Sequence, residues 1–152
     1  MGSYDVRAWT AAPPEVVYEL LLDGSTWPEW SDIGSYEPGD PGERAGGAVG
    51  DVRVFTSGGT VSRERITLLE QDARMDYEML SGGLGLLPGY RGRIDLVPAR
   101  GGTEIRWRAT WRRSVPVLGL AMQAFLRRFQ QRMVDGLAAF AAARTREAPA
   151  PE

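Results

Sequence analysis

The feature that most constrains this chain is a run of segments in which polar and apolar residues alternate, followed by one long segment with helical spacing. Five alternating segments between residues 51 and 113 are typical of strands with one buried and one wet face: Asp51–Ser57, Thr60–Leu69, Arg74–Leu80, Tyr90–Val97 and Thr103–Arg113. The connections between them are short, apart from residues 81–89. Short connections predict that each strand pairs antiparallel with its neighbour in the chain.

Segments before this run complete the pattern. Ser3–Thr10 alternates in the same way, and another short strand is expected near Ile33–Glu37. Between them, Pro14–Leu22 is expected to form a helix, because proline suits the first helical turn and Glu15 complements the helix dipole. A second short helix is expected over Thr26–Trp30.

A single long helix is predicted over Val117–Ala143. Apolar residues recur there at spacings of three and four, which places them on one helical face: Leu118, Met122, Phe125, Phe129, Met133, Gly136 and Phe140. Residues 145–152 have no apolar pattern and are expected to form a disordered tail. Residues 1–144 should therefore form one α+β domain, in which a curved antiparallel sheet of about seven strands wraps around the C-terminal helix, with two short helices after the first strand.

Composition excludes several classes of chemistry. The chain has no His and no Cys, and all 18 of its basic residues are Arg. It therefore lacks thiolate nucleophiles, disulfides, His-based metal ligands and the Lys that a Schiff base requires. We expect neither a metal site nor a cofactor. Any acid–base catalysis would have to use Asp, Glu, Tyr or water.

Charge and hydropathy set expectations about location and partners. The net charge of −2 provides no bulk attraction to nucleic acid or to an anionic membrane. The longest uncharged stretch near the C-terminus, Ser114–Leu126, is too short to span a bilayer, and no secretory pattern opens the sequence. We therefore expect a cytoplasmic protein without a membrane span or a nucleic-acid partner, either a monomer or a homodimer.

Strand parity places one carboxylate on the buried face of the sheet. If residues 70–73 form a turn, the register of the hairpin follows from it. The outward-facing pairs are then Thr67 with Asp76 and Arg65 with Glu78. The inward-facing pairs are Leu68 with Met75, Ile66 with Tyr77 and Glu64 with Met79. An inward carboxylate is costly unless it is paired or protonated. Glu64 is therefore expected either to form a structural ion pair with an Arg or to be a polar group in a cavity, with a raised pKa. Tyr77 and Tyr90 share its face, either as core residues or as contacts of the same ligand.

Three Arg-x-Arg repeats fall on the opposite, solvent-facing side of the sheet: Arg63/Arg65, Arg91/Arg93 and Arg106/Arg108. One interpretation is a platform for an anion or RNA. The other is a solvated sheet face balanced by interleaved acids, namely Asp76, Glu78, Asp95 and Glu104. The interleaving and the slightly negative net charge favour the second interpretation.

The apolar stripe of the long helix also allows two interpretations. It either packs as ordinary core or forms one wall of an apolar cavity, because a curved sheet that holds a single helix often leaves its concavity partly empty. In the second case, Gly58-Gly59 and residues 82–89 would be mobile lips around an opening.

Several segments resemble the START-like, helix-grip superfamily (SRPBCC), in particular its bacterial polyketide cyclase/dehydrase-like members. The matching segments are APPEVVY (12–18), STWPEWS (25–31), RERI (63–66), YRG (90–92), GTEIRW (102–107) and MVDGL (133–137). The resemblance covers residues 3–143 and is specific for the fold. It implies a deep pocket between the sheet and the C-terminal helix.

The resemblance also implies where a ligand would bind. Glu64 and Tyr90 are similar by position to the cavity-facing polar residues of ligand-binding relatives. The expected ligand-binding residues are Val52, Val54, Tyr77, Met79, Trp107, Met122, Phe125, Phe129 and Met133. The expected gate residues are Gly58, Gly59, Gly83, Leu84 and Leu86. In contrast to the aromatase/cyclases of the superfamily, the sequence shows no assured inward-facing Arg to anchor a polyketide.

Three functions are consistent with these expectations. The first is binding of a hydrophobic or aromatic small molecule of polyketide or lipid size, with an aldol-type cyclisation and dehydration if the protein is an enzyme. Glu64 would then shuttle protons, and Tyr90 would hydrogen-bond a carbonyl. The second is a non-catalytic carrier or sensor. The third is an interaction domain of the co-chaperone type that uses the outer Arg face.

Overall fold

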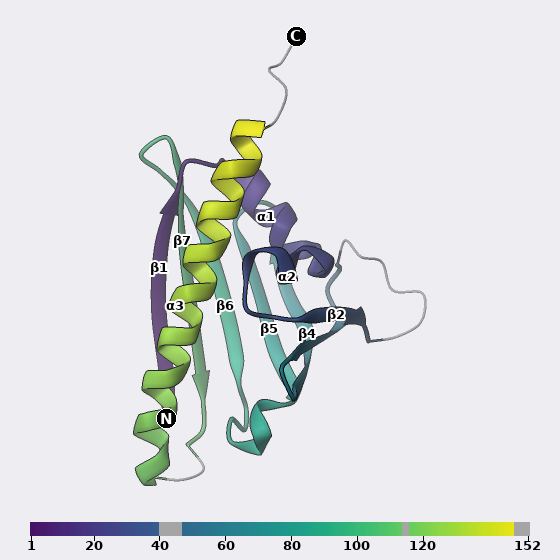
Figure 1. The fold of residues 1–152 in the computed structure, drawn as a ribbon, viewed down its shortest axis with the longest axis vertical. Coiled ribbons are helices and arrows are strands. Elements are labelled where there is room, and N and C mark those ends of the chain that lie inside the picture. The colour runs from purple at the N-terminus through teal and green to yellow at the C-terminus, as the bar shows by residue number, and fades with distance from the viewer. Residues whose placement is uncertain (40–46, 114–115, 148–152) are drawn as a thin grey trace.

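Seven strands form one antiparallel sheet within residues 1–39, 47–113 and 116–147, the residues described by the computed structural model. The strands are β1 (Gly2–Thr10), β2 (Ser35–Pro38), β3 (Val52–Ser57), β4 (Thr60–Glu70), β5 (Arg74–Ser81), β6 (Arg91–Ala99) and β7 (Gly102–Trp111). Their order in the sheet is β1-β7-β6-β5-β4-β3-β2, and every neighbouring pair is antiparallel. Each strand thus pairs with its neighbour in the chain, except that β1 pairs with β7 (Figure 1).

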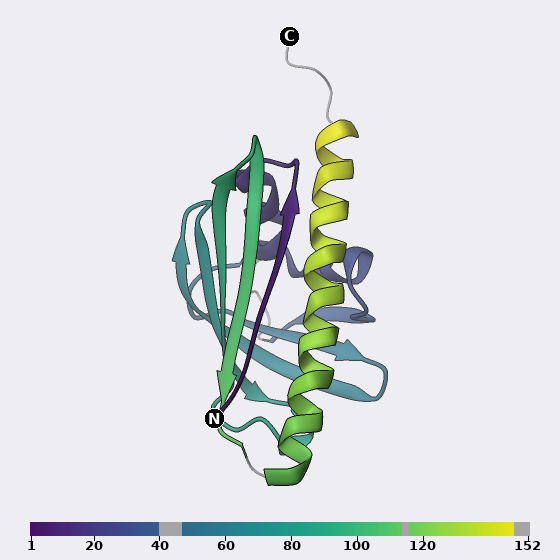
Figure 2. The ribbon, with the colours of Figure 1, turned by 90° about the vertical axis from the view of Figure 1, so that its left-hand side faces the viewer.

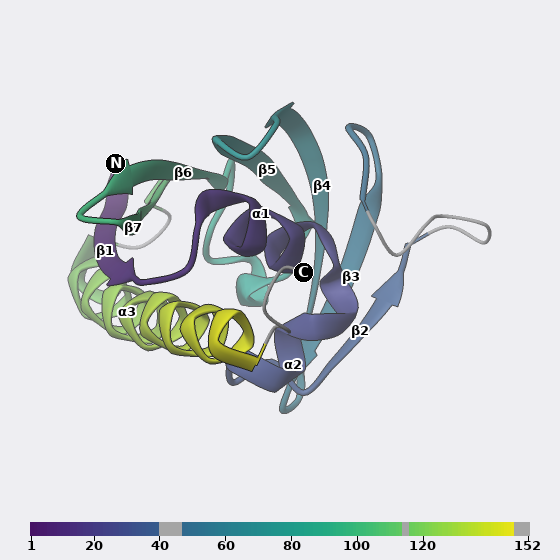
Figure 3. The same ribbon diagram turned by 90° about the horizontal axis from the view of Figure 1, so that it is seen from above.

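Helices cover the concave side of this sheet. The helix α1 (Pro14–Leu22), the 3-10 turn η1 (Gly24–Thr26) and α2 (Trp27–Trp30) follow β1, and the 3-10 turn η2 (Gly83–Gly85) lies between β5 and β6. The long helix α3 (Pro116–Glu147) runs beside β1. Figures 2 and 3 show the sheet curving around α1, with α3 along its open side. This arrangement confirms the predicted α+β class and the order of its elements.

The hairpin of β4 and β5 contains an irregularity that the alternating pattern did not reveal. As predicted, Ile66 pairs with Tyr77, and the two pairs before it, Arg65 with Glu78 and Glu64 with Met79, are also in register. Beyond Ile66 the register shifts, so that Leu68 faces Asp76 and Leu69 faces Met75. The predicted pairs of Thr67 with Asp76 and Leu68 with Met75 are therefore wrong. A bulge adds a residue to one strand, and period two alone gives no signal for it.

The face that α3 buries coincides only in part with the predicted one. Its buried side chains are Gln130, Met133, Val134, Leu137, Ala138 and Ala141. Of the predicted stripe, Met133 is buried, Met122, Phe129 and Phe140 are partly buried, and Phe125 is 61% exposed. The predicted stripe consists mostly of the largest apolar residues of the segment, whereas α3 packs on β1 and α2 mainly through smaller residues. The side chain of Leu118 lies outside the described residues.

The ends of two predicted segments also differ from the structure. The helix α3 continues to Glu147, so residues 145–147 are helical rather than a disordered tail, and residues 148–152 lie outside the described residues. Residues 40–46, which lie in a glycine-rich segment between β2 and β3, are also outside the described residues. No helix in the described part of the chain is both long and apolar enough to cross a membrane.

One close contact fixes the distance between α3 and α2. A Cβ atom built on Gly136 would lie 2.0 Å from the carbonyl oxygen of Trp30, the last residue of α2. No real side chain is tolerated at that distance from a backbone atom, so α3 approaches α2 this closely only because residue 136 is glycine. Elsewhere in α3, a Cβ atom on Gly119 would meet only the Arg113 side chain, at 3.4 Å.

We predict that Gly136→Ala destabilises the fold. Two packed backbones would have to separate, at a cost of about 1–3 kcal/mol, partly offset by the better helix propensity of alanine. The free energy of unfolding, measured by urea titration, should fall. Gly119→Ala is the matched control and should leave it unchanged or slightly raised. Equal stability of the two variants would show that the Trp30 contact does not hold α3 in place.

Candidate functional site: a partly open cavity under helix α3

A cavity of about 360 Å³ lies between the concave face of the sheet and the N-terminal half of α3. This volume lies within the range of small-molecule sites in proteins. Its walls come from most layers of the fold: Trp27, Ile33, Phe55, Ser57, Thr60, Ser62, Glu64, Tyr77, Met79, Gly83, Leu84, Leu87, Tyr90, Trp107, Met122, Phe125, Leu126, Phe129, Gln130 and Met133. Most of these side chains are apolar or aromatic.

Trp27 is the centre of the aromatic wall. Its ring stacks on Phe55 at 4.6 Å between ring centres and meets Trp107 edge-on at 5.7 Å. Its Nε1 donates to the carbonyl oxygen of Leu21 at 3.2 Å. Because the polar edge of Trp27 is used within the protein, the part of its ring that faces the cavity is apolar.

Glu64 brings a carboxylate into this apolar space. It lies in β4, with Arg53 of β3 and Met79 of β5 as its register partners, and its residue is only 9% exposed. Within the described part of the chain, no side chain or backbone group forms a hydrogen bond or ion pair with the carboxylate. Burial raises the pKa of Glu64 to about 7, although the positive charge of Arg53 opposes this rise. Near neutral pH the group therefore exists in both protonation states.

A row of tyrosine hydroxyls adjoins Glu64. The hydroxyls of Tyr4 and Tyr90 hydrogen-bond to each other, and the hydroxyl oxygens of Tyr77 and Tyr90 lie 3.4 Å apart. The indole Nε1 of Trp107 donates to the Tyr77 hydroxyl at 2.9 Å. Burial raises the pKa of all three tyrosines above the usual value, so that their hydroxyls stay protonated. Tyr77 and Tyr90 line the cavity, and Tyr4 lies behind them.

Arg53 is an inward-facing cation that the sequence analysis did not identify, although it is not among the residues that line the cavity, where an Arg would have to lie to anchor a polyketide. The residue is 1% exposed, and its Nη1 donates to the carbonyl oxygen of Leu21 at 2.7 Å. Its guanidinium carbon lies 4.9 Å from the centre of the Trp27 ring and 5.3 Å from that of Phe55. These two rings line the cavity, so Arg53 lies behind its wall rather than in it. Its positive charge nevertheless acts on Glu64 and lowers the pKa of that carboxyl group, against the larger effect of burial.

The structure brings together most of the residues that the sequence analysis selected. Eleven of them line the cavity: Glu64, Tyr90, Tyr77, Met79, Trp107, Met122, Phe125, Phe129, Met133, Gly83 and Leu84. Val52 and Val54 do not, because in β3 it is Arg53 and Phe55 that face inward. Gly58, Gly59 and Leu86 are also absent from the lining, although Ser57 and Thr60, on either side of the glycine pair, belong to it.

Some lining residues were missed although the sequence carried a signal for them. Thr60 and Ser62 share the parity of Glu64 along β4, so the same alternation predicts that they face inward. In α3, the series Leu126, Gln130, Met133 and Leu137 has spacings of four, three and four. That series marks the buried face better than the series of Phe residues does. For Trp27 and Ile33, which lie in or after a very short helix, periodicity gives no signal.

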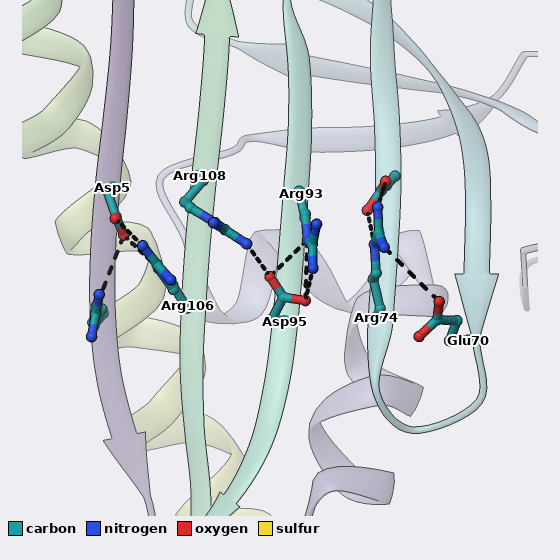
Figure 4. A network of polar contacts seen from close by, with 9 residues as sticks. Asp5, Glu70, Arg74, Arg93, Asp95, Arg106 and Arg108 are labelled. Atoms are coloured by element: carbon teal, nitrogen blue, oxygen red, sulfur yellow. Dashed lines mark hydrogen bonds and ion pairs between the residues drawn. The ribbon is translucent and has the colours of Figure 1, made fainter.

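The convex face of the sheet is a network of charge pairs. Figure 4 shows Asp95 between Arg93 and Arg108, at 2.9 and 2.7 Å, and Arg106 paired with Asp5 at 2.6 Å. Arg65 and Arg74 pair with Glu78 and Asp76. This pairing agrees with the interpretation of a charge-balanced solvated face rather than an anion platform. No cluster of three or more His, Cys, Asp or Glu side chains in the described ranges could hold a metal ion.

Comparison with solved structures shows how widely this architecture recurs. A START superfamily protein from Mycobacterium smegmatis has a TM-score of 0.77 at 12% sequence identity, over 94% of this chain and 99% of the other. The protein XoxI from Bacillus cereus has a TM-score of 0.75 at 16% identity, over 92% and 95% of the two chains. The di-domain ARO/CYC StfQ from the steffimycin biosynthetic pathway has a TM-score of 0.72 at 19% identity, over 94% of this chain and 51% of the other.

At these identities the structural likeness establishes the fold alone. No curated protein matches the sequence significantly. The sequence model of the family described as polyketide cyclase / dehydrase and lipid transport matches residues 1–143. The curved sheet, the long C-terminal helix and the cavity between them agree with this match, and the chain belongs to the polyketide cyclase / dehydrase and lipid transport family.

Proposed function

We propose that the protein binds a largely hydrophobic or aromatic small molecule in the cavity under α3, with the ligand's polar group against Glu64, Tyr77 and Tyr90. The observation that carries this proposal is the Glu64 carboxylate, which is buried in an apolar cavity and has no hydrogen-bond partner among the described residues. A buried polar group without a partner costs free energy. A ligand that hydrogen-bonds to Glu64 would recover that free energy.

The polar groups of the wall restrict the chemistry of the ligand. The tyrosine hydroxyls stay protonated, so they can offer a proton to a carbonyl or hydroxyl oxygen of the ligand. Glu64 accepts a hydrogen bond when ionised and can donate one when protonated. A neutral ligand with a carbonyl or phenol group fits this set of groups in either state. An anionic ligand is repelled when Glu64 is ionised.

We predict that filling the cavity abolishes binding of a neutral aromatic probe, N-phenyl-1-naphthylamine. Ser62→Phe places a ring in the cavity and should weaken probe binding at least tenfold, as followed by probe fluorescence. Val61→Phe is the matched control, because Val61 is the preceding residue of β4 and is half-exposed to solvent. Weak binding in the wild type, or equal binding in the two variants, would place the probe outside this cavity.

We predict that the charge of Glu64 controls binding of the sulfonated analogue, 8-anilinonaphthalene-1-sulfonate. With a pKa of about 7, Glu64 is neutral below that pH and negative above it. Affinity for the sulfonate should therefore fall about tenfold between pH 5.5 and 8.5, because two like charges meet in a low-dielectric site. The neutral probe should show no such change. In Glu64→Gln the pH dependence of sulfonate binding should disappear, and its persistence would assign the titration to another group.

A second candidate function, aldol-type cyclisation and dehydration, is favoured by the protonation equilibrium of Glu64. A carboxyl group with a pKa of about 7 can take a proton from a carbon next to a carbonyl and can later return it to a leaving hydroxyl. Tyr90 would hydrogen-bond the oxygen that gains negative charge. The new carbon–carbon bond then forms by attack on a second carbonyl, and loss of water gives the conjugated product. The fold likeness to an ARO/CYC protein supports this candidate.

We predict that a catalytic protein accelerates closure of 1-phenylhexane-1,5-dione to the cyclic enone, followed by its absorbance. Glu64→Gln should reduce kcat at least a hundredfold and Tyr90→Phe about tenfold, with affinity for the neutral naphthylamine probe changed less than twofold. Glu37→Gln, in the exposed strand β2, is the control and should keep full activity. If the wild type gives no acceleration while still binding the probe, the protein is a carrier or sensor.

A further inference from the structure

The end of the molecule that contains the cavity mouth displays large apolar side chains. Leu84 of η2 is 79% exposed and Phe125 of α3 is 61% exposed, and both line the cavity. Leu120, near the start of α3, is 63% exposed. Figure 1 shows that η2 and the first turns of α3 occupy the same end of the fold. We call this area, together with the arginines described next, the mouth-end surface.

Arginines surround these apolar side chains. The backbone N–H of Arg112 donates to the carbonyl oxygen of Pro88, in the connection between η2 and β6, and Arg113 donates to Gln123 of α3 at 3.0 Å. These two contacts place both arginines between η2 and α3. Arg128 lies three residues after Phe125 on the same face of the helix. Arg63 is opposite Ser81, where β5 leads into η2.

The charges of this end are unbalanced, unlike those of the convex sheet face. Segments 57–63, 79–91 and 111–132, which contribute to this end, contain seven Arg and no Asp or Glu, and of these seven only Arg132 pairs with an acid in the described ranges, Asp32 at 3.3 Å. Arg63, Arg112, Arg113 and Arg128 are exposed and form no ion pair with an acid in the described ranges. On the convex face, by contrast, Arg65, Arg74, Arg93, Arg106 and Arg108 are all paired with acids. One end of the molecule is therefore positively charged, although the net charge of the chain is −2.

The backbone of η2 holds Leu84 in an unusual conformation. Leu84 has φ of 56° and ψ of 25°, in the left-handed region that non-glycine residues rarely adopt. Gly82, Gly83 and Gly85 around it also have positive φ. This sequence of conformations holds the leucine side chain largely in solvent, at a local cost in free energy.

We propose that the mouth-end surface docks on an anionic lipid bilayer. Exposed apolar side chains can enter the headgroup region of a bilayer, and arginines next to them are attracted to anionic lipids. A bilayer accepts apolar side chains from separate elements without a matching shape, which favours it over an acidic protein partner. Docking in this orientation would point the cavity mouth at the acyl chains. A hydrophobic ligand could then pass between bilayer and cavity without crossing water.

We predict that the unliganded protein floats with vesicles of phosphatidylcholine containing 30% phosphatidylglycerol, and only weakly with phosphatidylcholine alone. Binding should fall steeply as salt rises from 50 to 300 mM. The double variant Arg112→Gln/Arg128→Gln should lose at least tenfold in vesicle affinity. The matched control Arg144→Gln/Arg146→Gln removes the same charge from the exposed last turn of α3 and should change affinity less than twofold.

A second pair of variants tests the apolar component. Leu84→Asn keeps a residue that tolerates the left-handed conformation and should weaken binding to anionic vesicles about fivefold or more. Val97→Asn removes a half-exposed apolar side chain from β6 and should have no effect. Failure of the wild type to bind anionic vesicles at 50 mM salt, or equal losses in the test and control variants, would overturn the proposal. Because no ligand is present, this outcome is separate from whether the cavity binds the naphthylamine probe.

Discussion

The contact between Gly136 and the carbonyl oxygen of Trp30 sets how closely α3 approaches α2, and the position of α3 beside the sheet depends on that approach. It holds the C-terminal half of α3 against α2, where Val134, Leu137 and Ala141 are fully buried. Among residues 119–129 of α3 no glycine makes such a contact, and the side chains are partly buried or exposed. One straight helix therefore packs tightly at one end and covers a cavity at the other.

The cavity combines apolar walls with charges that are kept apart. Arg53 forms no ion pair with the described residues, and its guanidinium contacts a carbonyl oxygen and two aromatic faces instead. Glu64 is attracted by that charge but forms no ion pair with it. A direct ion pair would have left Glu64 ionised and fully satisfied. The separation keeps the carboxyl group able to exchange a proton and to accept a partner from the cavity.

Much of this architecture was predictable from the sequence, and the failures have local physical causes. Alternation identified the long strands and placed Glu64 and Tyr77 on the inner face, because a strand has a strict period of two. The bulge after Ile66 and the inward side of β3 were missed, since Val52 and Val54 are apolar yet face away from the cavity. Buried polar residues such as Arg53 and Gln130 depend on contacts made by other elements, which no local pattern records.

The tyrosine row has a consequence for which ligand atoms the wall can recognise. Trp107 has only one indole proton and gives it to the Tyr77 hydroxyl, so Tyr77 must send its own proton elsewhere. Each following hydroxyl likewise has a single proton, so a hydroxyl that donates to an arriving oxygen can no longer donate to its neighbour in the row. Tyr90 can still accept from both Tyr77 and Tyr4, because a hydroxyl oxygen has two lone pairs. A ligand oxygen bound by Tyr90 would thus meet a hydroxyl whose own oxygen is polarised by two donors, which strengthens the bond it gives.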